Sequence, residues 1–317
     1  MAALAAVLLV LGGRLLFEPG PPAIRSRATQ VVLPPGAGVA KIAAVLQRAG
    51  VIRSRTVFIV AAELTLAAPR LKAGDYEIRS RSSMADILNL IRIGGVARRF
   101  VTVPEGLSAV AVADLLAREG ALSGPIAPAR EGSILPETYE IRQGETRAAV
   151  TRRMQAAQDA LLAGLWAKRA PNLPYKTPEE AVILASIVEK ETAKAYERPH
   201  IAALFINRLR LGMRLETDPT VIYGLTGGTP LGHGLRVSEL AQRTPYNTYQ
   251  ISGLPPTPIC NPGKAALVAA LHPDQSGDLY FVADGTGGHV FATSFQAHQR
   301  NVARWRAIEH AAPGPKP

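Results

Sequence analysis

The pattern of apolar and polar positions is clearest between residues 177 and 195. Apolar or small residues recur there at helical spacing, at positions 181, 184, 185, 188, 192 and 195. Thr177, Pro178 and Glu180 precede this run as a capping box with proline at the first helical position, so we expect a helix to begin here. Glu189 and Glu191 lie on the flanks of the apolar stripe rather than at its centre.

Similar patterns divide the rest of the chain into strands and helices. Runs of β-branched and aromatic residues predict strands, whereas apolar residues at helical spacing between capping residues predict helices. We expect strands within 31–33, 71–78 and 133–141, helices within 39–49, 55–64, 84–93 and 146–168 and from 201 onward, a hairpin over 278–294, and a last helix over 294–310.

Two segments of the chain resemble each other at an offset of 70 residues. Residues 32–52 and 102–122 share Pro34/Pro104, Gly36/Gly106 and Gly50/Gly120, along with an alanine, a leucine and an arginine. A true duplication and convergence on one strand–turn–helix template both explain the match, since turn and cap glycines recur for backbone reasons. Either way, residues 30–125 predict small αβ units suited to binding or positioning.

The chain as a whole reads as an α+β protein with four parts. We expect a membrane anchor and linker over 1–29, the αβ region over 30–125, a mixed α+β catalytic domain over 126–310 and a flexible tail over 311–317. Gly, Pro, Thr, Tyr and Asn dominate residues 226–263, which predicts the loop-rich structure where binding surfaces concentrate.

The first residues favour an uncleaved single-pass membrane anchor. Residues 2–17 are apolar apart from Arg14, although the run is shorter than the ~20 residues of a spanning helix. A secretory signal would show a basic start and a cleavage site, and neither is clear in this segment. A buried helix is the alternative to an anchor. Arg25 and Arg27 follow the run and no basic residue precedes it, so the positive-inside rule does not place the body outside.

Composition narrows the classes of partner. The net charge of +11 suits an anionic partner, or reflects arginines scattered through helices. The sequence contains no basic block with interleaved aromatic residues, so a nucleic-acid partner is not favoured. The single cysteine, Cys260, excludes an internal disulfide, and the six dispersed histidines predict no metal site and no metal cofactor.

The two glutamates differ in their expected surroundings. Side chains lean toward the start of their helix, so Glu191 faces Ile187 and Val188, whereas Glu189 faces Ala185 and Ser186. Bulky aliphatic neighbours desolvate a carboxylate and raise its pKa, as a general acid requires. This favours Glu191 as a proton donor, while two solvated charges remain the alternative.

Polar residues downstream suggest a sugar-binding groove. Asn207 and Arg208 would be unusual as filler in an apolar helix. Tyrosine rings offer stacking surfaces for sugar faces, and amides offer directed hydrogen bonds. The candidate binding residues are Asn207, Arg208, Thr217, Asp218, Thr220, Tyr223, Tyr246, Asn247, Tyr249 and His289, the last of which could equally be an ordinary hairpin histidine.

An ordered series of motifs carries a family resemblance. "ASIVEKET", "ER", "FINRL", "MRLETDPTVIYG", "TPYNTY", "GLPP", "AALHP" and "YFVADGTGGHVF" follow one another between residues 130 and 305. Together they resemble the endolytic murein transglycosylase family, also called the YceG-like family. The first part is similar in layout, with an anchor and LysM-like αβ modules.

The resemblance implies an inner-membrane enzyme whose body lies in the periplasm. Such an enzyme cleaves the bond between N-acetylmuramic acid (MurNAc) and N-acetylglucosamine (GlcNAc) inside nascent glycan strands and leaves 1,6-anhydroMurNAc ends. Its catalytic glutamate is followed by a hydroxyl residue, which here identifies Glu191, followed by Thr192. Peptidoglycan strands are the implied substrate, peptidoglycan synthases are implied partners, and no cofactor is implied.

Two other functions stay open at this point. Ordinary glycosidases pair two carboxylates, so Asp218 or Glu189 could position water in a hydrolytic muramidase. A non-catalytic peptidoglycan-binding scaffold is the alternative from another class.

Overall fold

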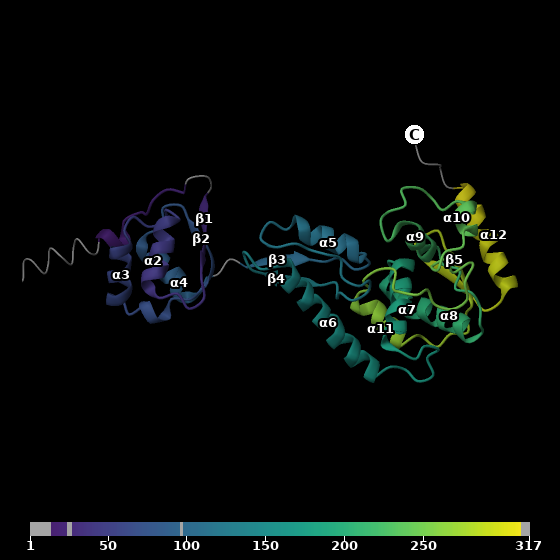
Figure 1. Ribbon diagram of the computed structural model, residues 1–317. Helices are drawn as coiled ribbons and strands as arrows, with labels where there is room; N and C mark the ends of the chain where they lie inside the picture. Colours follow the sequence, from purple (N-terminus) through teal and green to yellow (C-terminus); the bar gives the residue numbers. More distant parts are fainter. Residues whose placement is uncertain (1–13, 24–26, 96–97, 312–317) are drawn as a thin grey trace, which may run out of the picture. The chain divides into compact units, whose positions relative to one another are not determined.

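The computed structural model describes residues 14–23, 27–95 and 98–311 and shows an α+β protein with small two-stranded sheets (Figure 1). The chain divides into two compact units. Unit 1 comprises residues 1–100 with 140–144, and unit 2 comprises residues 101–139 with 145–317. Most of the predicted anchor, residues 2–17, lies outside the described residues. Its described part, residues 14–17, is helical. Within the described ranges no helix is long and apolar enough to cross a membrane.

Unit 1 contains a two-stranded antiparallel sheet with its helices on one side, as Figure 1 shows. Its elements are β1 (Ala28–Leu33), α2 (Val39–Arg48), α3 (Arg55–Leu64), the 3-10 turn η1 (Ala68–Arg70), β2 (Gly74–Arg79) and α4 (Met84–Ile93). Leu33 pairs with Gly74 at one end of the sheet. Phe58 and Tyr76 are fully buried in the core, and the Tyr76 hydroxyl donates to the Lys72 carbonyl at 2.8 Å.

Capping residues fix the helix limits in unit 1 as the sequence predicts. Ser54 accepts a hydrogen bond from the Val57 amide at the start of α3. Ser83 and Asp86 form a reciprocal capping box at the start of α4, which ends at Gly94 in the left-handed conformation.

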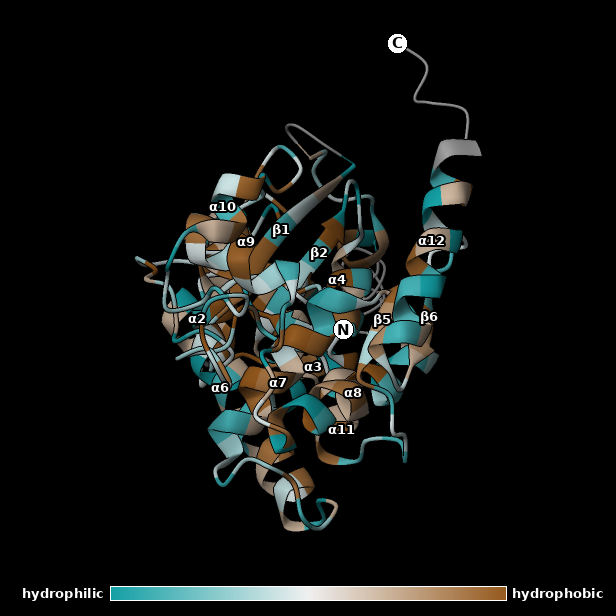
Figure 2. Ribbon diagram, turned by 90° about the vertical axis from the view of Figure 1, so that its right-hand side faces the viewer, coloured by the Kyte–Doolittle hydropathy of each residue, from teal (hydrophilic) through white to brown (hydrophobic). Residues whose placement is uncertain are grey.

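Unit 2 contains a helical core to which a small sheet and a hairpin are attached. Its elements, with the strands that cross the unit boundary, are β3 (Arg99–Thr102), α5 (Ala109–Arg118), β4 (Thr138–Ile141), α6 (Arg147–Ala167), α7 (Pro178–Glu191), the 3-10 turn η2 (Ala195–Glu197), α8 (Arg198–Arg210), α9 (Asp218–Thr226), α10 (Val237–Ala241), α11 (Lys264–Leu271), β5 (Tyr280–Ala283), β6 (His289–Ala292) and α12 (Phe295–Ala311). Helices α7, α8 and α11 supply most of the core, and Figure 2 shows the hydrophobic colouring along them.

The two similar sequence segments both fold as strand, turn and helix. Helix α5 begins and ends 70 residues after α2, and the turn glycines Gly36 and Gly106 both adopt positive φ, of 71° and 77°. Residues 119–137 contain no helix, so the second segment lacks a counterpart of α3.

In the structure residues 101–125 belong to the same compact unit as the helices that follow, whereas the sequence suggested a division near residue 125. The reason lies in hydrogen bonds from a distant loop. Fully buried Asn261 donates its backbone N–H to the Leu107 carbonyl at 2.8 Å and accepts the Ile134 N–H on its side chain at 3.0 Å. The Gly106 N–H in turn donates to the Asn261 carbonyl at 3.0 Å.

Candidate active site

Glu191 is the last residue of α7, one of the three helices that supply most of the core of unit 2. The predicted capping box is present, since Thr177 accepts from the Glu180 amide and Glu180 accepts from the Thr177 amide. Residues 181–188 are all buried. The helix is therefore fixed along its length, and Glu191 stands where it meets the surface.

Glu191 is half-buried as a residue, and its carboxyl group is largely enclosed. The Thr217 hydroxyl donates to its Oε2 at 2.6 Å. Burial raises the pKa of Glu191, and the nearby negative charge of Asp218 raises it further, although Thr217, His289 and Arg208 oppose this. A carboxylic acid with a raised pKa and access to solvent can donate a proton near neutral pH.

Glu189 lies in different surroundings. Its Oε1 accepts from Arg198 Nη2 at 2.9 Å, and its Oε2 accepts the Gly263 N–H at 2.9 Å. Only 5% of its side chain is exposed, so the alternative of a solvated charge is wrong for this residue. With both oxygens engaged, Glu189 ties the end of α7 to α8 and to the start of α11.

A cluster of buried threonines supports the Glu191 contact. The Thr217 amide donates to Thr248 Oγ1 at 3.1 Å, and the hydroxyls of Thr220 and Thr248 lie 2.8 Å apart. The Thr220 hydroxyl also donates to the Thr217 carbonyl at 2.7 Å. Sequence reasoning included Thr217 and Thr220 but missed Thr248, which lies 31 positions after Thr217 in the chain.

Asp218 and Tyr249 form a pair next to this cluster. The Tyr249 hydroxyl donates to Asp218 Oδ1 at 2.8 Å, and Asp218 is exposed at the start of α9. Burial and the hydrogen bond to Asp218 raise the pKa of Tyr249, so the phenol keeps its proton.

Tyr223 and Tyr246 form an aromatic pair, with ring centroids 4.9 Å apart. The Tyr223 hydroxyl donates to Glu131 Oε2 at 3.1 Å, and the Tyr246 hydroxyl lies 2.8 Å from Thr257 Oγ1. Sequence reasoning did not single out Glu131. Burial raises the pKa of its carboxyl group, which also accepts from the Ala109 amide at 2.8 Å.

Asn207, Arg208 and Asn247 hold backbone segments in place. The Asn207 amide donates to the Ser276 carbonyl at 2.7 Å. Arg208 donates through Nε to the Leu279 carbonyl at 2.7 Å and through Nη1 to the Leu215 carbonyl at 2.9 Å. Asn247 is fully buried, and its amide donates to the carbonyls of Leu240 and Gln242 at 2.9 and 2.6 Å.

His289 is attached to Glu197, a residue that sequence reasoning left without a role. The imidazole Nδ1 lies 2.9 Å from Glu197 Oε2, and the His289 backbone N–H donates to Glu197 Oε1 at 3.1 Å. The "ER" motif, formed by Glu197 and Arg198, could have drawn attention to Glu197 in the sequence, because it follows Glu191 closely.

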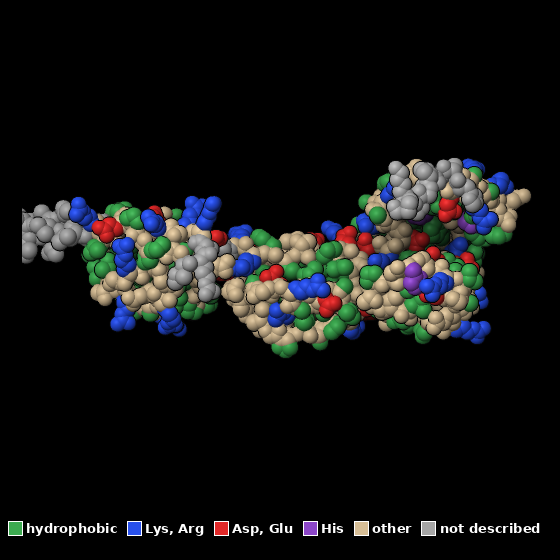
Figure 3. Space-filling view, turned by 90° about the horizontal axis from the view of Figure 1, so that it is seen from above, with side chains coloured by type: hydrophobic (Ala, Val, Ile, Leu, Met, Phe, Trp, Pro, Cys, Tyr) green, Lys and Arg blue, Asp and Glu red, His purple; other side chains and the backbone are tan. Residues whose placement is uncertain are grey.

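The surface of unit 2 is hollowed, and Figure 3 shows acidic side chains exposed in the hollow. In the part of the chain that the structure describes, no cluster of three or more His, Cys, Asp or Glu is arranged to hold a metal ion.

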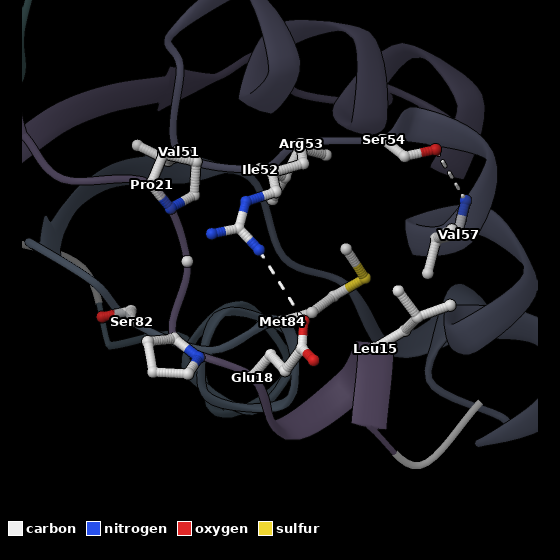
Figure 4. Close-up of a pocket in the computed structure, with 12 residues that line it drawn as sticks. Leu15, Glu18, Pro21, Val51, Ile52, Arg53, Ser54, Val57, Ser82 and Met84 are labelled. Atoms are coloured by element: carbon white, nitrogen blue, oxygen red, sulfur yellow. Dashed lines mark hydrogen bonds and ion pairs between the residues drawn. The ribbon is translucent and has the colours of Figure 1, made fainter. Parts of the chain in front are cut away.

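Unit 1 has a small pocket of its own, shown in Figure 4. Its lining includes Glu18, Val51, Arg53, Ser54 and Met84, with Arg53 Nη1 3.8 Å from Glu18 Oε2. None of the predicted site residues lies there.

Comparison with known proteins gives a consistent result. Residues 31–304 match the YceG-like family. A Streptococcus pneumoniae D39 protein named endolytic murein transglycosylase is 29% identical over 323 residues, covering 86% of this chain and 57% of the relative. A Bacillus subtilis 168 protein of the same name is 27% identical, covering 92% of this chain and 90% of the relative.

The chain thus spans little more than half the length of the Streptococcus relative. A solved structure of a putative YceG-like protein from Listeria monocytogenes superposes with a TM-score of 0.55 at 26% identity, covering 86% of this chain and 98% of the other. Since the family match extends over most of the sequence, this protein belongs to the YceG-like family.

Proposed function

We propose that the protein is an endolytic peptidoglycan transglycosylase that cleaves the MurNAc–GlcNAc bond within nascent glycan strands. The observation that carries this proposal is the position of Glu191, a half-buried residue at the end of α7 whose carboxyl pKa is raised by burial. The names of the Streptococcus and Bacillus relatives support the same reaction and substrate.

In the proposed reaction one carboxyl group acts twice. Glu191 first donates its proton to the glycosidic oxygen as the bond from that oxygen to the MurNAc anomeric carbon breaks. The 6-hydroxyl of the same MurNAc then attacks the anomeric carbon, and the Glu191 carboxylate takes the hydroxyl proton. The product has a 1,6-anhydro ring, and Glu191 returns to its protonated state. Thr217 binds Oε2, so Oε1 is the oxygen available for this transfer.

The surroundings of the other carboxylates support an intramolecular reaction over hydrolysis. A hydrolytic enzyme needs a second carboxylate that can activate water. Both oxygens of Glu189 are engaged by Arg198 and Gly263, and Asp218 accepts the Tyr249 hydroxyl. Of the two carboxylate oxygens of Asp218, only Oδ1 accepts a hydrogen bond from the described residues, so hydrolysis is the competing outcome of the experiment below.

The remaining candidate residues fit two kinds of role in this proposal. Asp218, Tyr223, Tyr246, Tyr249 and His289 would contact the glycan directly. Asn207, Arg208, Thr217, Thr220 and Asn247 would hold the backbone or Glu191 in place, as their hydrogen bonds suggest.

The proposal extends to the first part of the chain. The order β1, α2, α3, β2 with an antiparallel strand pair supports a LysM-like glycan-binding module in unit 1. An anchor in the inner membrane, with the body in the periplasm near peptidoglycan synthases, would bring the site to newly made strands. Truncation before residue 28, followed by membrane fractionation, tests the anchor, because removing it should release the protein.

Digestion of purified glycan strands tests the reaction. Wild-type protein should release fragments with anhydro ends, detected by mass spectrometry, and Glu191→Gln should release none while still binding strands. Glu189→Gln is the matched control two positions away, and it should retain appreciable cleavage. Reducing ends would instead indicate a hydrolytic muramidase, and intact strands would indicate a scaffold.

A further inference from the structure

Glu197 accepts three hydrogen bonds from two parts of the chain. Its Oε2 accepts the Thr192 hydroxyl at 2.9 Å and His289 Nδ1 at 2.9 Å, and its Oε1 accepts the His289 backbone N–H at 3.1 Å. Glu197 is buried, with 6% of its side chain exposed. Burial alone would raise the pKa of Glu197, but the bonds from His289 and Thr192 outweigh it and lower this pKa. Glu197 is therefore a carboxylate that only accepts hydrogen bonds.

The Glu197 carboxylate joins the end of helix α7 to the β5–β6 hairpin. Thr192 directly follows Glu191, and its extended backbone ends α7. His289 is the first residue of β6. The side chain of Glu197, from the η2 turn, thus sets the distance between the residue after Glu191 and the hairpin.

Gly288 shows how closely the hairpin approaches Glu197. A Cβ atom at this position would lie 2.6 Å from Glu197 Oε1 and 2.7 Å from Lys194 Nζ. Three hydrogen bonds fix the Glu197 carboxylate, so it cannot move aside at low cost. Only glycine fits here without opening the contact.

The hydrogen bond to Glu197 also determines which ring nitrogen of His289 carries a proton. An accepting carboxylate requires a hydrogen on Nδ1, so in the neutral ring Nε2 has a lone pair and is an acceptor. The hydrogen bonds recorded within the described residues engage Nδ1 and leave Nε2 available. With 15% of its side chain exposed, His289 remains accessible, and it lies close enough to Glu191 for the two side chains to interact electrostatically when the ring is protonated.

We infer that Glu197 is a positioning residue that fixes the orientation and tautomer of His289, so that Nε2 accepts a hydrogen bond from a hydroxyl or N-acetyl N–H of the glycan beside Glu191. This inference rests on the proposed function for its substrate. It assigns to Glu197 a role in binding rather than in proton transfer.

Glu197→Gln is the informative substitution because an amide cannot replace both oxygens. If the amide NH₂ faces Thr192 and His289 Nδ1, the ring relieves the clash by moving its hydrogen to Nε2. If it faces the His289 backbone N–H, two donors oppose each other. Either orientation disturbs the bonds that hold the ring.

Nitrogen NMR of histidine-labelled protein tests the tautomer directly, with the His289 signals assigned from a His289→Gln sample. In the wild type at pH 8, Nδ1 should carry the hydrogen, and glycan strands added to the non-cleaving Glu191→Gln protein should shift the Nε2 signal. Glu197→Gln should move the hydrogen toward Nε2. A wild-type ring protonated on Nε2, or an Nε2 signal that saturating glycan leaves unchanged, overturns the inference.

Cleavage kinetics provide the second test, with Asp278→Asn as the matched control. Asp278 Oδ2 lies 2.8 Å from His200 Nε2 in another carboxylate–imidazole pair of unit 2. Glu197→Gln should raise KM at least about tenfold, the effect of losing about 1.4 kcal/mol of binding, with folding measured by circular dichroism, whereas Asp278→Asn should leave KM unchanged. Gly288→Ala should raise KM as Glu197→Gln does.

Equal KM values for Glu197→Gln, Asp278→Asn and wild type would overturn the inference. Failure of the proposed function looks different, because the wild type itself would then give no anhydro ends, and the NMR titration with strands would still decide the role of Glu197.

Discussion

At the scale of single residues, two glutamates two positions apart have opposite surroundings. Glu191 accepts one hydroxyl and its pKa is raised mainly by burial, whereas Glu189 binds an arginine and a backbone amide. The aliphatic neighbours of Glu191 made its desolvation predictable from sequence. The partners of Glu189 were not predictable, because Arg198 and Gly263 lie nine and 74 positions away.

The raised pKa of Glu191 predicts that Glu191→Gln is more stable than the wild type at neutral pH. A carboxyl group with a raised folded-state pKa stabilises the fold fully below its unfolded pKa, and this contribution is lost as pH rises toward and through the folded pKa. Glutamine stays neutral throughout and keeps an oxygen for the Thr217 hydroxyl. Thermal melts should show a Tm several degrees higher for the variant at pH 8 and equal values near pH 4, which lies about at the ordinary glutamate pKa. A variant less stable at pH 8 would contradict the desolvation of Glu191.

The same shift sets the direction of the pH profile of cleavage. In the proposed reaction the acid form of Glu191 is the active one, so kcat should fall as pH rises through its pKa and this limb should lie above the range of ordinary glutamates. Measuring kcat between pH 4 and 9 checks this, and a limb near about pH 4.3 would contradict it.

At the scale of elements, local signals predicted the helices better than the contacts between them. Caps at Ser54, Ser83 and Thr177 mark helix starts that the structure confirms. The grouping of α5 with the other helices of unit 2 depends on Asn261, whose partners lie more than 120 positions earlier. No pattern of neighbouring residues contains that information.

Asn261→Ala should therefore destabilise unit 2 strongly. The change leaves the buried Ile134 N–H without an acceptor and removes the side-chain bond to the Leu107 carbonyl. We expect a loss of about 2–4 kcal/mol in the free energy of unfolding, from the cost of unsatisfied buried groups. Denaturant titration measures this, and Asn301→Ala on α12 is the control with a change within about 0.5 kcal/mol. Equal losses of unfolding free energy in both variants would show that the hydrogen bonds of Asn261 do not specifically stabilise unit 2.

At the scale of the whole molecule, the chain has two separate hydrophobic cores. One surrounds Phe58 and Tyr76 in unit 1, and the other surrounds Leu184, Phe205 and Leu267 in unit 2. Sequence patterns predicted the α+β class. They suggested a division near residue 125, because the repeat at an offset of 70 residues suggested that both copies belong to one region, whereas unit 2 of the structure begins at Val101.

Separate cores predict separate unfolding of the two units. Phe58→Ala leaves a cavity in unit 1, which should cost about 3–5 kcal/mol. In calorimetry we expect two transitions, of which this substitution lowers only one, and cleavage of short glycan fragments by unit 2 should persist. A single transition that shifts as a whole would show that the units unfold together.

The position of Glu191 at the last residue of α7 has one more consequence. The final carbonyls of a helix have no intrahelical partners and present a partial negative charge, the negative end of the helix macrodipole. That potential disfavours a carboxylate and adds to the effect of burial, so the acidity of Glu191 depends in part on where the helix stops. The extended backbone of Thr192 ends the helix immediately after Glu191. An insertion that lengthened α7 by one turn would move Glu191 away from this potential and make it a stronger acid, even with its neighbouring side chains unchanged.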